Sequence, residues 1–165
     1  MATTYTLINS TTVGSGGSSS VTFTSIPSTY TDLVIKMSTR QTTAAVYGIL
    51  EISINGTSTN ESYRMIEGNG STASSNNGAF IYVGAGVGAS ATTNTFSNFE
   101  LYFPNYTSSN YKSISIDGVG ENNATTAYAN LQAGLWSNSS PITSISLESN
   151  FVQYSTFYLY GISNT

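Results

Sequence analysis

Residues 98–103 read Asn98-Phe-Glu-Leu-Tyr-Phe103, and the side chains in this stretch alternate between apolar and more polar ones. Successive side chains of a β-strand point to opposite faces, so Phe99, Leu101 and Phe103 would share one face of an extended chain. A strand with one apolar face is typical of an antiparallel sheet that covers a core on one side and meets solvent on the other. The stretch therefore predicts a surface strand of an antiparallel sheet.

The same period-2 alternation recurs along the chain and sets the fold class. It is clearest in four further segments: Leu33–Met37, Leu50–Ile54, Ile114–Ile116 and Ile145–Leu147. Weaker strand candidates are Thr4–Ile8, Ser20–Ile26, Tyr63–Ile66, Ala79–Val83, Thr126–Trp136 and Ser155–Ile162. Turn-forming pairs lie between them, at Asn55-Gly56, Asn69-Gly70, Asn77-Gly78 and Asp117-Gly118. Short strands with frequent turns and no helical periodicity predict an all-β protein, an antiparallel β-sandwich or a barrel.

The length of 165 residues suits one domain, so we expect a single β-sandwich domain over residues 1–165. A Gly/Ser tract at Gly14–Ser20 is expected to be flexible. Residues 1–19 are then either an N-terminal arm that pairs with a neighbouring subunit or a strand joined to its own sheet by a long surface loop. Two further stretches rich in small polar residues, Gly68–Gly78 and Gly84–Asn94, are expected to be exposed loops.

Charge is scarce, and this excludes some classes of partner. Charged residues make up 7% of the chain, the net charge is −4, and the four cations are scattered: Lys36, Arg40, Arg64 and Lys112. Nucleic-acid binding needs clustered Lys or Arg to neutralise phosphates, so we expect no nucleic-acid partner, and no anionic membrane partner for the same reason. The first eight residues do not resemble a signal peptide, and no apolar run has the length of a membrane helix.

Residues with catalytic chemistry are few. Histidine and cysteine are absent, which removes the commonest general base, the usual nucleophile–His pairs and thiolate metal sites. Lys36 and Lys112 are the only lysines, and both are expected on the solvent face of a strand. A glycosidase would need two converging carboxylates, for which pairs such as Glu61 with Glu67 or Asp117 with Glu121 are candidates. We expect these acids to be solvated instead, and the protein not to be an enzyme.

No bound metal or cofactor is expected. Asp117-Gly-Val-Gly-Glu121 carries oxygen ligands suited to calcium but lacks the spacing of a known calcium loop, which favours a polar hairpin turn. Gly84, Gly86 and Gly88 resemble a phosphate-binding loop only superficially, because neither a lysine nor a helical pattern follows them.

The last strand carries the strongest sign of a contact surface. Phe157 and Leu159 alternate with Tyr158 and Tyr160, so one face is apolar and the other is rich in tyrosine. Tyrosine offers a large contact area and a hydroxyl, and it is enriched at interfaces. Such a strand lies either between two layers or at a subunit contact. We select Tyr158 and Tyr160, together with Tyr5 and Leu7 at the N-terminus, as partner-contact residues; aromatic side chains could also stack on sugars.

Several phrases of the sequence resemble a family of virion proteins from tailed bacteriophages. They include Phe23-Thr-Ser-Ile-Pro-Ser-Thr-Tyr-Thr-Asp-Leu-Val-Ile35, Ile52-Ser-Ile-Asn-Gly56, Gly134-Leu-Trp-Ser137 and Ser155-Thr-Phe-Tyr-Leu-Tyr-Gly-Ile162. The resemblance implies a jelly-roll-like β-sandwich that is made in the host bacterial cytoplasm and resides on the virion. It is compatible with a capsid decoration protein or a tail component, and it brings no catalytic residues with it.

Two functional expectations follow. The first is a decoration (cement) protein, a homotrimer that binds the major capsid protein on the outside of the shell and stabilises it. The second is a tail protein, a fibre or receptor-binding module that recognises glycans of the host surface through its rim loops and aromatic side chains.

Overall fold

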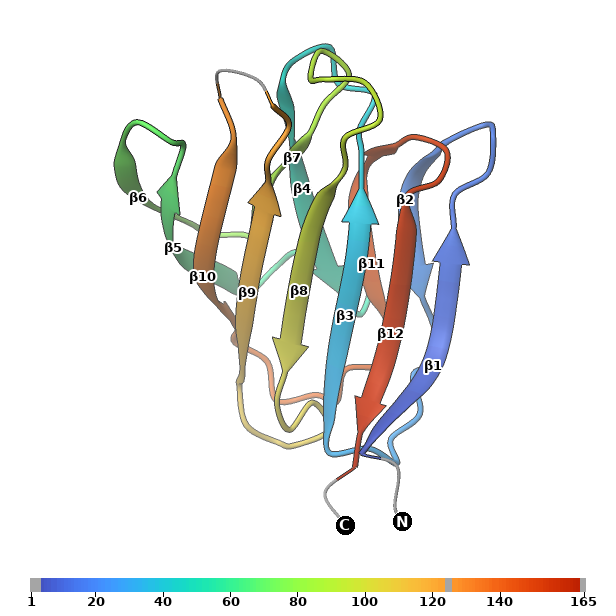
Figure 1. Ribbon diagram of the computed structural model, residues 1–165. Helices are drawn as coiled ribbons and strands as arrows, with labels where there is room; N and C mark the ends of the chain where they lie inside the picture. Colours follow the sequence, from blue (N-terminus) through green and yellow to red (C-terminus); the bar gives the residue numbers. More distant parts are fainter. Residues whose placement is uncertain (1–3, 124–125, 164–165) are drawn as a thin grey trace.

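The protein is built from β-strands throughout the part of the chain that the structure describes. This computed structural model describes residues 4–123 and 126–163. Twelve strands are present, and no helix occurs within the described ranges (Figure 1). The strands are β1 (Tyr5–Thr12), β2 (Ser18–Phe23), β3 (Asp32–Thr39), β4 (Tyr47–Ile54), β5 (Glu61–Gly68), β6 (Ala73–Gly78), β7 (Tyr82–Val87), β8 (Ser97–Phe103), β9 (Lys112–Gly120), β10 (Tyr128–Trp136), β11 (Ile145–Phe151) and β12 (Thr156–Ile162). Nothing in the described segments is a helix with the length and hydropathy needed to cross a membrane.

The strands form two antiparallel sheets of unequal width that pack face to face, which confirms the predicted β-sandwich. The larger sheet has eight strands in the order β1-β12-β3-β8-β9-β10-β5-β6, and the smaller has four in the order β2-β11-β4-β7. The chain changes sheet at every connection except β5–β6, β8–β9 and β9–β10. This repeated crossing wraps the chain around the core, as in a jelly roll, with the meander β8–β9–β10 widening the larger sheet.

One hydrophobic cluster fills the space between the sheets. The alternation that predicted the strands decides which side chains enter it: Phe99, Leu101 and Phe103 of β8 are buried, and so are Leu50 and the other inward residues of β4. Each fully buried Leu, Ile or Phe side chain contributes about 1.5–3 kcal/mol of transfer free energy. Because a four-stranded sheet cannot cover the whole inner face of an eight-stranded one, part of the inner face of the larger sheet is left uncovered.

The stretches expected as loops at Gly68–Gly78 and Gly84–Asn94 are strands in part, which corrects that prediction. Ala73–Gly78 is β6, paired with β5, and the second stretch begins inside β7. In β7, glycine serves packing: a Cβ on Gly86 would lie 2.4 Å from Nε2 of Gln41, a residue buried between the sheets. The Gly/Ser tract is also partly ordered, because Ser18–Ser20 belong to β2.

Two of the predicted turns are wrong, because both pairs of residues belong to strands. Asp117 and Gly118 lie within β9, and Asn77 and Gly78 are the last two residues of β6. A Cβ on Gly118 would lie 2.1 Å from Cδ1 of Phe99, so glycine makes room for a core ring on the neighbouring strand. Asn55-Gly56 does form a turn between β4 and β5. Both residues have positive φ, as the two central residues of a type I′ turn require.

The N-terminal segment is paired with its own chain from Tyr5 onward. β1 lies antiparallel to β12 at one edge of the larger sheet, with an irregularity in register between Leu7 and Asn9. The connection to β2 runs over residues 13–17. The first three residues of the segment considered as an arm lie outside the described residues.

Candidate functional site

The four residues selected as partner contacts come together on the outer face of the larger sheet. Leu7 of β1 lies opposite Tyr160 of β12. The rings of Tyr5 and Tyr160 are 6.2 Å apart at an interplanar angle of 66°, and those of Tyr158 and Tyr160 are stacked at 6.4 Å. Since Phe157 and Leu159 of β12 are buried in the core, Tyr158 and Tyr160, which alternate with them, point outward.

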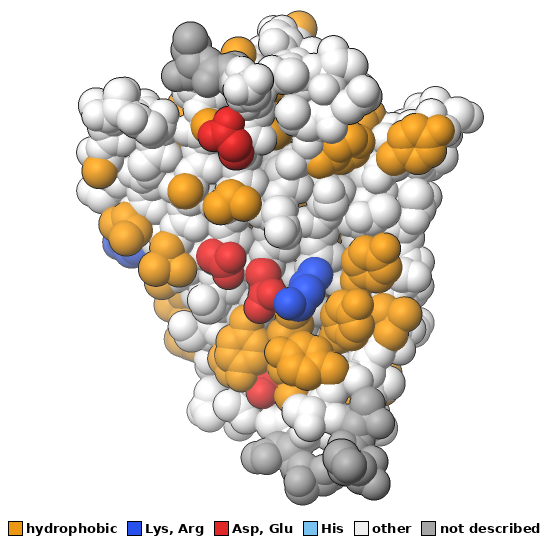
Figure 2. Space-filling model, viewed as in Figure 1, with side chains coloured by type: hydrophobic (Ala, Val, Ile, Leu, Met, Phe, Trp, Pro, Cys, Tyr) orange, Lys and Arg blue, Asp and Glu red, His pale blue; other side chains and the backbone are white. Residues whose placement is uncertain are grey.

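Tyr102 on β8 extends this group across the sheet. Val34 of β3 pairs with both Tyr160 and Tyr102, and although it faces outward it is only 1% exposed, because the rings cover it. The Tyr102 hydroxyl donates to Oδ2 of Asp32 at 2.9 Å, which fixes the ring, and burial raises the pKa of this phenol. We call Tyr5, Leu7, Tyr102, Tyr158 and Tyr160 the tyrosine strip; it is a preorganised aromatic surface (Figure 2).

A small charged cluster lies beside the strip at the centre of the face. Nζ of Lys36 is 2.7 Å from a carboxylate oxygen of Glu100, which raises the pKa of the lysine through that hydrogen bond. Asp117 pairs with Glu100 across β9 and β8, and its pKa is raised by burial and then by the Glu100 charge. An exposed ion pair contributes little to stability. At protein–protein interfaces in general, charged groups contribute to orientation and specificity more than to affinity.

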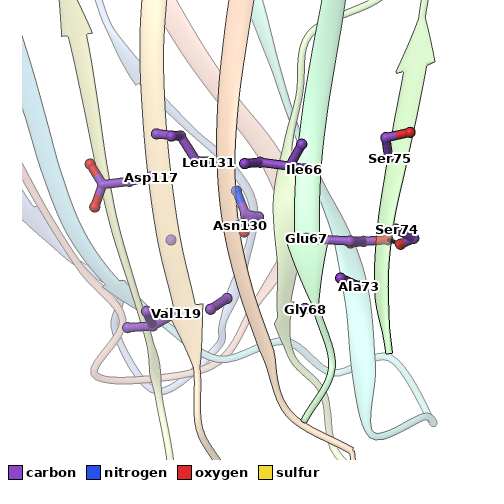
Figure 3. A pocket seen from close by; sticks show the side chains of 12 residues that line it. Ile66, Glu67, Gly68, Ala73, Ser74, Ser75, Asp117, Val119, Asn130 and Leu131 are labelled. Carbon is purple, nitrogen blue, oxygen red and sulfur yellow. Dashed lines mark hydrogen bonds between the residues drawn. The ribbon is translucent and has the colours of Figure 1, made fainter. Parts of the chain in front are cut away.

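On the other side of the charged cluster is an apolar hollow that the sequence analysis missed. Ile66, Val119 and Leu131 are 61%, 51% and 54% exposed, respectively, and line a shallow hollow of about 730 Å³ over β9, β10, β5 and β6. Figure 3 shows Ile66 and Leu131 on the neighbouring strands β5 and β10, where they pair in register. We call these three residues the aliphatic hollow. In β10 the polar residues Asn130 and Gln132 face inward, whereas the apolar Leu131 between them faces solvent. This reversal of the usual alternation is the sequence signal for the hollow.

Lys112 does not lie on the solvent face, which corrects the prediction made for it. Its side chain is 1% exposed, and Nζ donates to the carbonyl oxygens of Ser108 at 2.7 Å, Ser140 at 2.7 Å and Asn138 at 3.2 Å. Nζ also lies 5.5 Å from the ring centroid of Trp136. Burial lowers the pKa of this ammonium. Lys112 therefore ties two loops together at one end of the sandwich.

Replacing Lys112 with methionine keeps the apolar stem but leaves three carbonyl groups without their charged donor. We expect the free energy of unfolding to fall by about 2–3 kcal/mol, the usual cost of losing hydrogen bonds to a charged group. Urea denaturation followed by circular dichroism measures it. Lys36→Met is the matched control, because its exposed ion pair should contribute less than about 1 kcal/mol. Equal losses in the two variants would contradict the structural role of Lys112.

The candidate carboxylates do not gather into a cluster. No group of three or more acidic side chains that could hold a metal ion occurs within residues 4–123 and 126–163. Asp117 lies on the outer face of the sheet, whereas Glu121 lies in the loop after β9, where it accepts a hydrogen bond from the Asn123 N–H at 2.6 Å. Glu61 and Glu67 start and nearly end the same strand, β5.

Of the four candidate acids, Glu61 is the one whose side chain is buried. Its Oε2 accepts the Ile81 N–H at 3.1 Å, and Oε1 has no partner among the described residues. Desolvation raises the pKa of this carboxyl to about 7, against the opposing effect of the Ile81 hydrogen bond and with a further contribution from the Glu148 charge. Glu61 therefore links the stability of the fold to pH.

Comparison with known proteins adds no family to this description. Neither the protein-family models nor the curated protein sequences contain a match to the chain.

Proposed function

We propose that the protein is a non-enzymatic structural protein of a tailed-bacteriophage virion, a decoration protein that binds the outside of the capsid shell through the outer face of its larger sheet. Its partner would be the major capsid protein, and homotrimers would bridge neighbouring shell subunits. Clustered copies gain strength from effective concentration as well as from individual contacts.

The observation that carries this proposal is the tyrosine strip. The exposed face of an antiparallel sheet is ordinarily polar, yet this one presents aromatic rings on one side and the aliphatic hollow on the other. Aromatic and other apolar side chains are the residues that anchor specific protein contacts. With only one exposed ion pair on this face among the described residues, binding would depend little on salt.

The experiment that tests the proposal is quantitative mass spectrometry of purified particles. A decoration protein is expected in the hundreds of copies, in a fixed ratio to the major capsid protein. Particles that lack it should release their nucleic acid at a lower temperature than complete ones. A few to a few dozen copies would instead support the tail protein, and unchanged thermal release would contradict a stabilising role.

A further inference from the structure

The wide overhang of the larger sheet leaves a groove on the inner side of β5 and β6. The smaller sheet ends at β7, whereas the larger one continues through β10, β5 and β6. Figure 1 shows β5 and β6 beyond the edge of the smaller sheet. A groove of about 350 Å³ lies between the overhang and the strands β4 and β7, a volume within the range of about 300–1,000 Å³ that ligand sites occupy.

Aromatic rings form the walls of this groove. They come from five residues on four strands and one loop: Tyr47, Tyr63, Phe80, Tyr82 and Tyr128. Tyr47 and Tyr128 approach to 4.7 Å at 69°, and Tyr63 lies 5.9 Å from both Phe80 and Tyr82, at 59° and 53°. The rings are therefore inclined to one another like the sides of a cage, and they do not form the flat platform on which a sugar ring stacks.

The groove also has a charge preference. The residues that line it include the carboxylate of Glu67 but no Lys or Arg. Ser74 holds that carboxylate through a hydrogen bond from its hydroxyl at 3.2 Å. The pKa values of Tyr63 and Tyr82 are raised by burial and next by the Glu67 charge, which places the negative charge near both phenols. An anion would be repelled here, and a cation attracted.

We propose that this groove binds a methylated ammonium group of the choline type. Such a group is rounded, carries one positive charge and has an apolar surface. Inclined aromatic rings recognise it through cation–π contacts, and a neighbouring carboxylate neutralises it. The site lies on the inner side of the overhang, away from the tyrosine strip, so the proposal stands independently of the virion function.

The test is a titration of the full-length protein with choline chloride, followed by intrinsic tyrosine fluorescence. The comparison ligand is 3,3-dimethyl-1-butanol, which has nearly the same shape without the charge. Choline is expected to bind saturably and at least about tenfold more tightly than the alcohol, because cation–π contacts require the positive charge. Equal affinity for the two ligands, or no saturable binding of choline, would overturn the proposal.

Variants locate the site. Tyr47→Leu and Glu67→Gln are each expected to weaken choline binding by about tenfold, because one removes a ring and the other the charge. Glutamine can still accept the Ser74 hydrogen bond, so Glu67→Gln should fold normally, which circular dichroism checks. Tyr111→Leu and Glu121→Gln, outside the groove, are the matched controls and should bind like the wild type. Equal losses in the controls would overturn the assignment to this groove.

A third ligand distinguishes the source of the ammonium group. Glycerophosphocholine binding as tightly as choline identifies an esterified headgroup, whereas binding of choline alone identifies a free small molecule; both outcomes support the proposed chemistry. Binding of a neutral methyl glycoside in place of choline would overturn it and favour a saccharide.

Discussion

The double variant Tyr158→Ser/Tyr160→Ser is expected to bind purified shells about 100-fold more weakly than the wild-type protein. Both rings lie at the centre of the tyrosine strip, where Tyr160 contacts Tyr5 and stacks on Tyr158. An interface residue that matters to binding costs more than about 1 kcal/mol when it is truncated. A loss of about 1.4 kcal/mol for each ring is a tenfold change in affinity per ring, which gives about 100-fold for the two. Co-sedimentation of the variant with particles that lack the protein measures the effect.

The control for this loss is Tyr111→Ser. Tyr111 is 63% exposed, more than Tyr158 at 38%, but it lies outside the strip, in the loop before β9. Its removal should therefore leave binding unchanged. Both variants should remain folded, because Phe157 and Leu159, which hold β12 in the core, are untouched; circular dichroism checks this. Wild-type binding by the double variant would exclude the strip as the contact surface.

The Glu61→Gln variant is expected to be more stable than the wild type at pH 8, by about 3 kcal/mol, and equally stable near pH 4. The carboxyl has a pKa of about 7 in the folded protein against 4.5 ordinarily. Below pH 4.5 both folded and unfolded chains hold the proton, so no penalty exists. As the pH rises from 4.5 to 7 the unfolded chain loses its proton first, and stability falls. Above pH 7 the full penalty is present.

Denaturation in urea at several pH values from 4 to 8 measures this dependence, and the difference between variant and wild type isolates Glu61 from other groups. Glutamine preserves the hydrogen bond from the Ile81 N–H because its carbonyl oxygen can replace Oε2. Glu121→Gln serves as the exposed control and should follow the wild type at every pH. A difference between Glu61→Gln and wild type that does not change with pH would refute the raised pKa.

The outward placement of Tyr158 and Tyr160 was predictable because β12 follows the simple alternation of a strand. Phe157 and Leu159 are apolar enough to fix which face is buried, and the outward placement of Tyr158 and Tyr160 follows. Their juxtaposition with Tyr5 and Leu7 depends on the pairing of β1 with β12, which joins the two ends of the chain. Alternation within one strand carries no information about such long-range pairing.

Lys112 shows a different failure. It shares its face with Ile114 and Ile116, so the alternation itself placed it inward, and only its charge suggested the solvent face. Burial is tolerated because three carbonyl groups satisfy the ammonium. Those partners come from loops whose positions the sequence pattern does not encode. β6 was missed for a related reason: Ala73–Gly78 has no apolar alternation and is a strand because β5 pairs with it.

The two outermost strands of the larger sheet, β1 and β6, have one more consequence. Each leaves a row of backbone amides and carbonyls unpaired by its own sheet, and neither contains a lysine or a proline, the residues that commonly keep a sheet edge from joining a second chain. Neighbouring copies held close together on a surface would therefore pair edge to edge through backbone hydrogen bonds, whose groups carry no net charge. The strength of such pairing would change little with ionic strength.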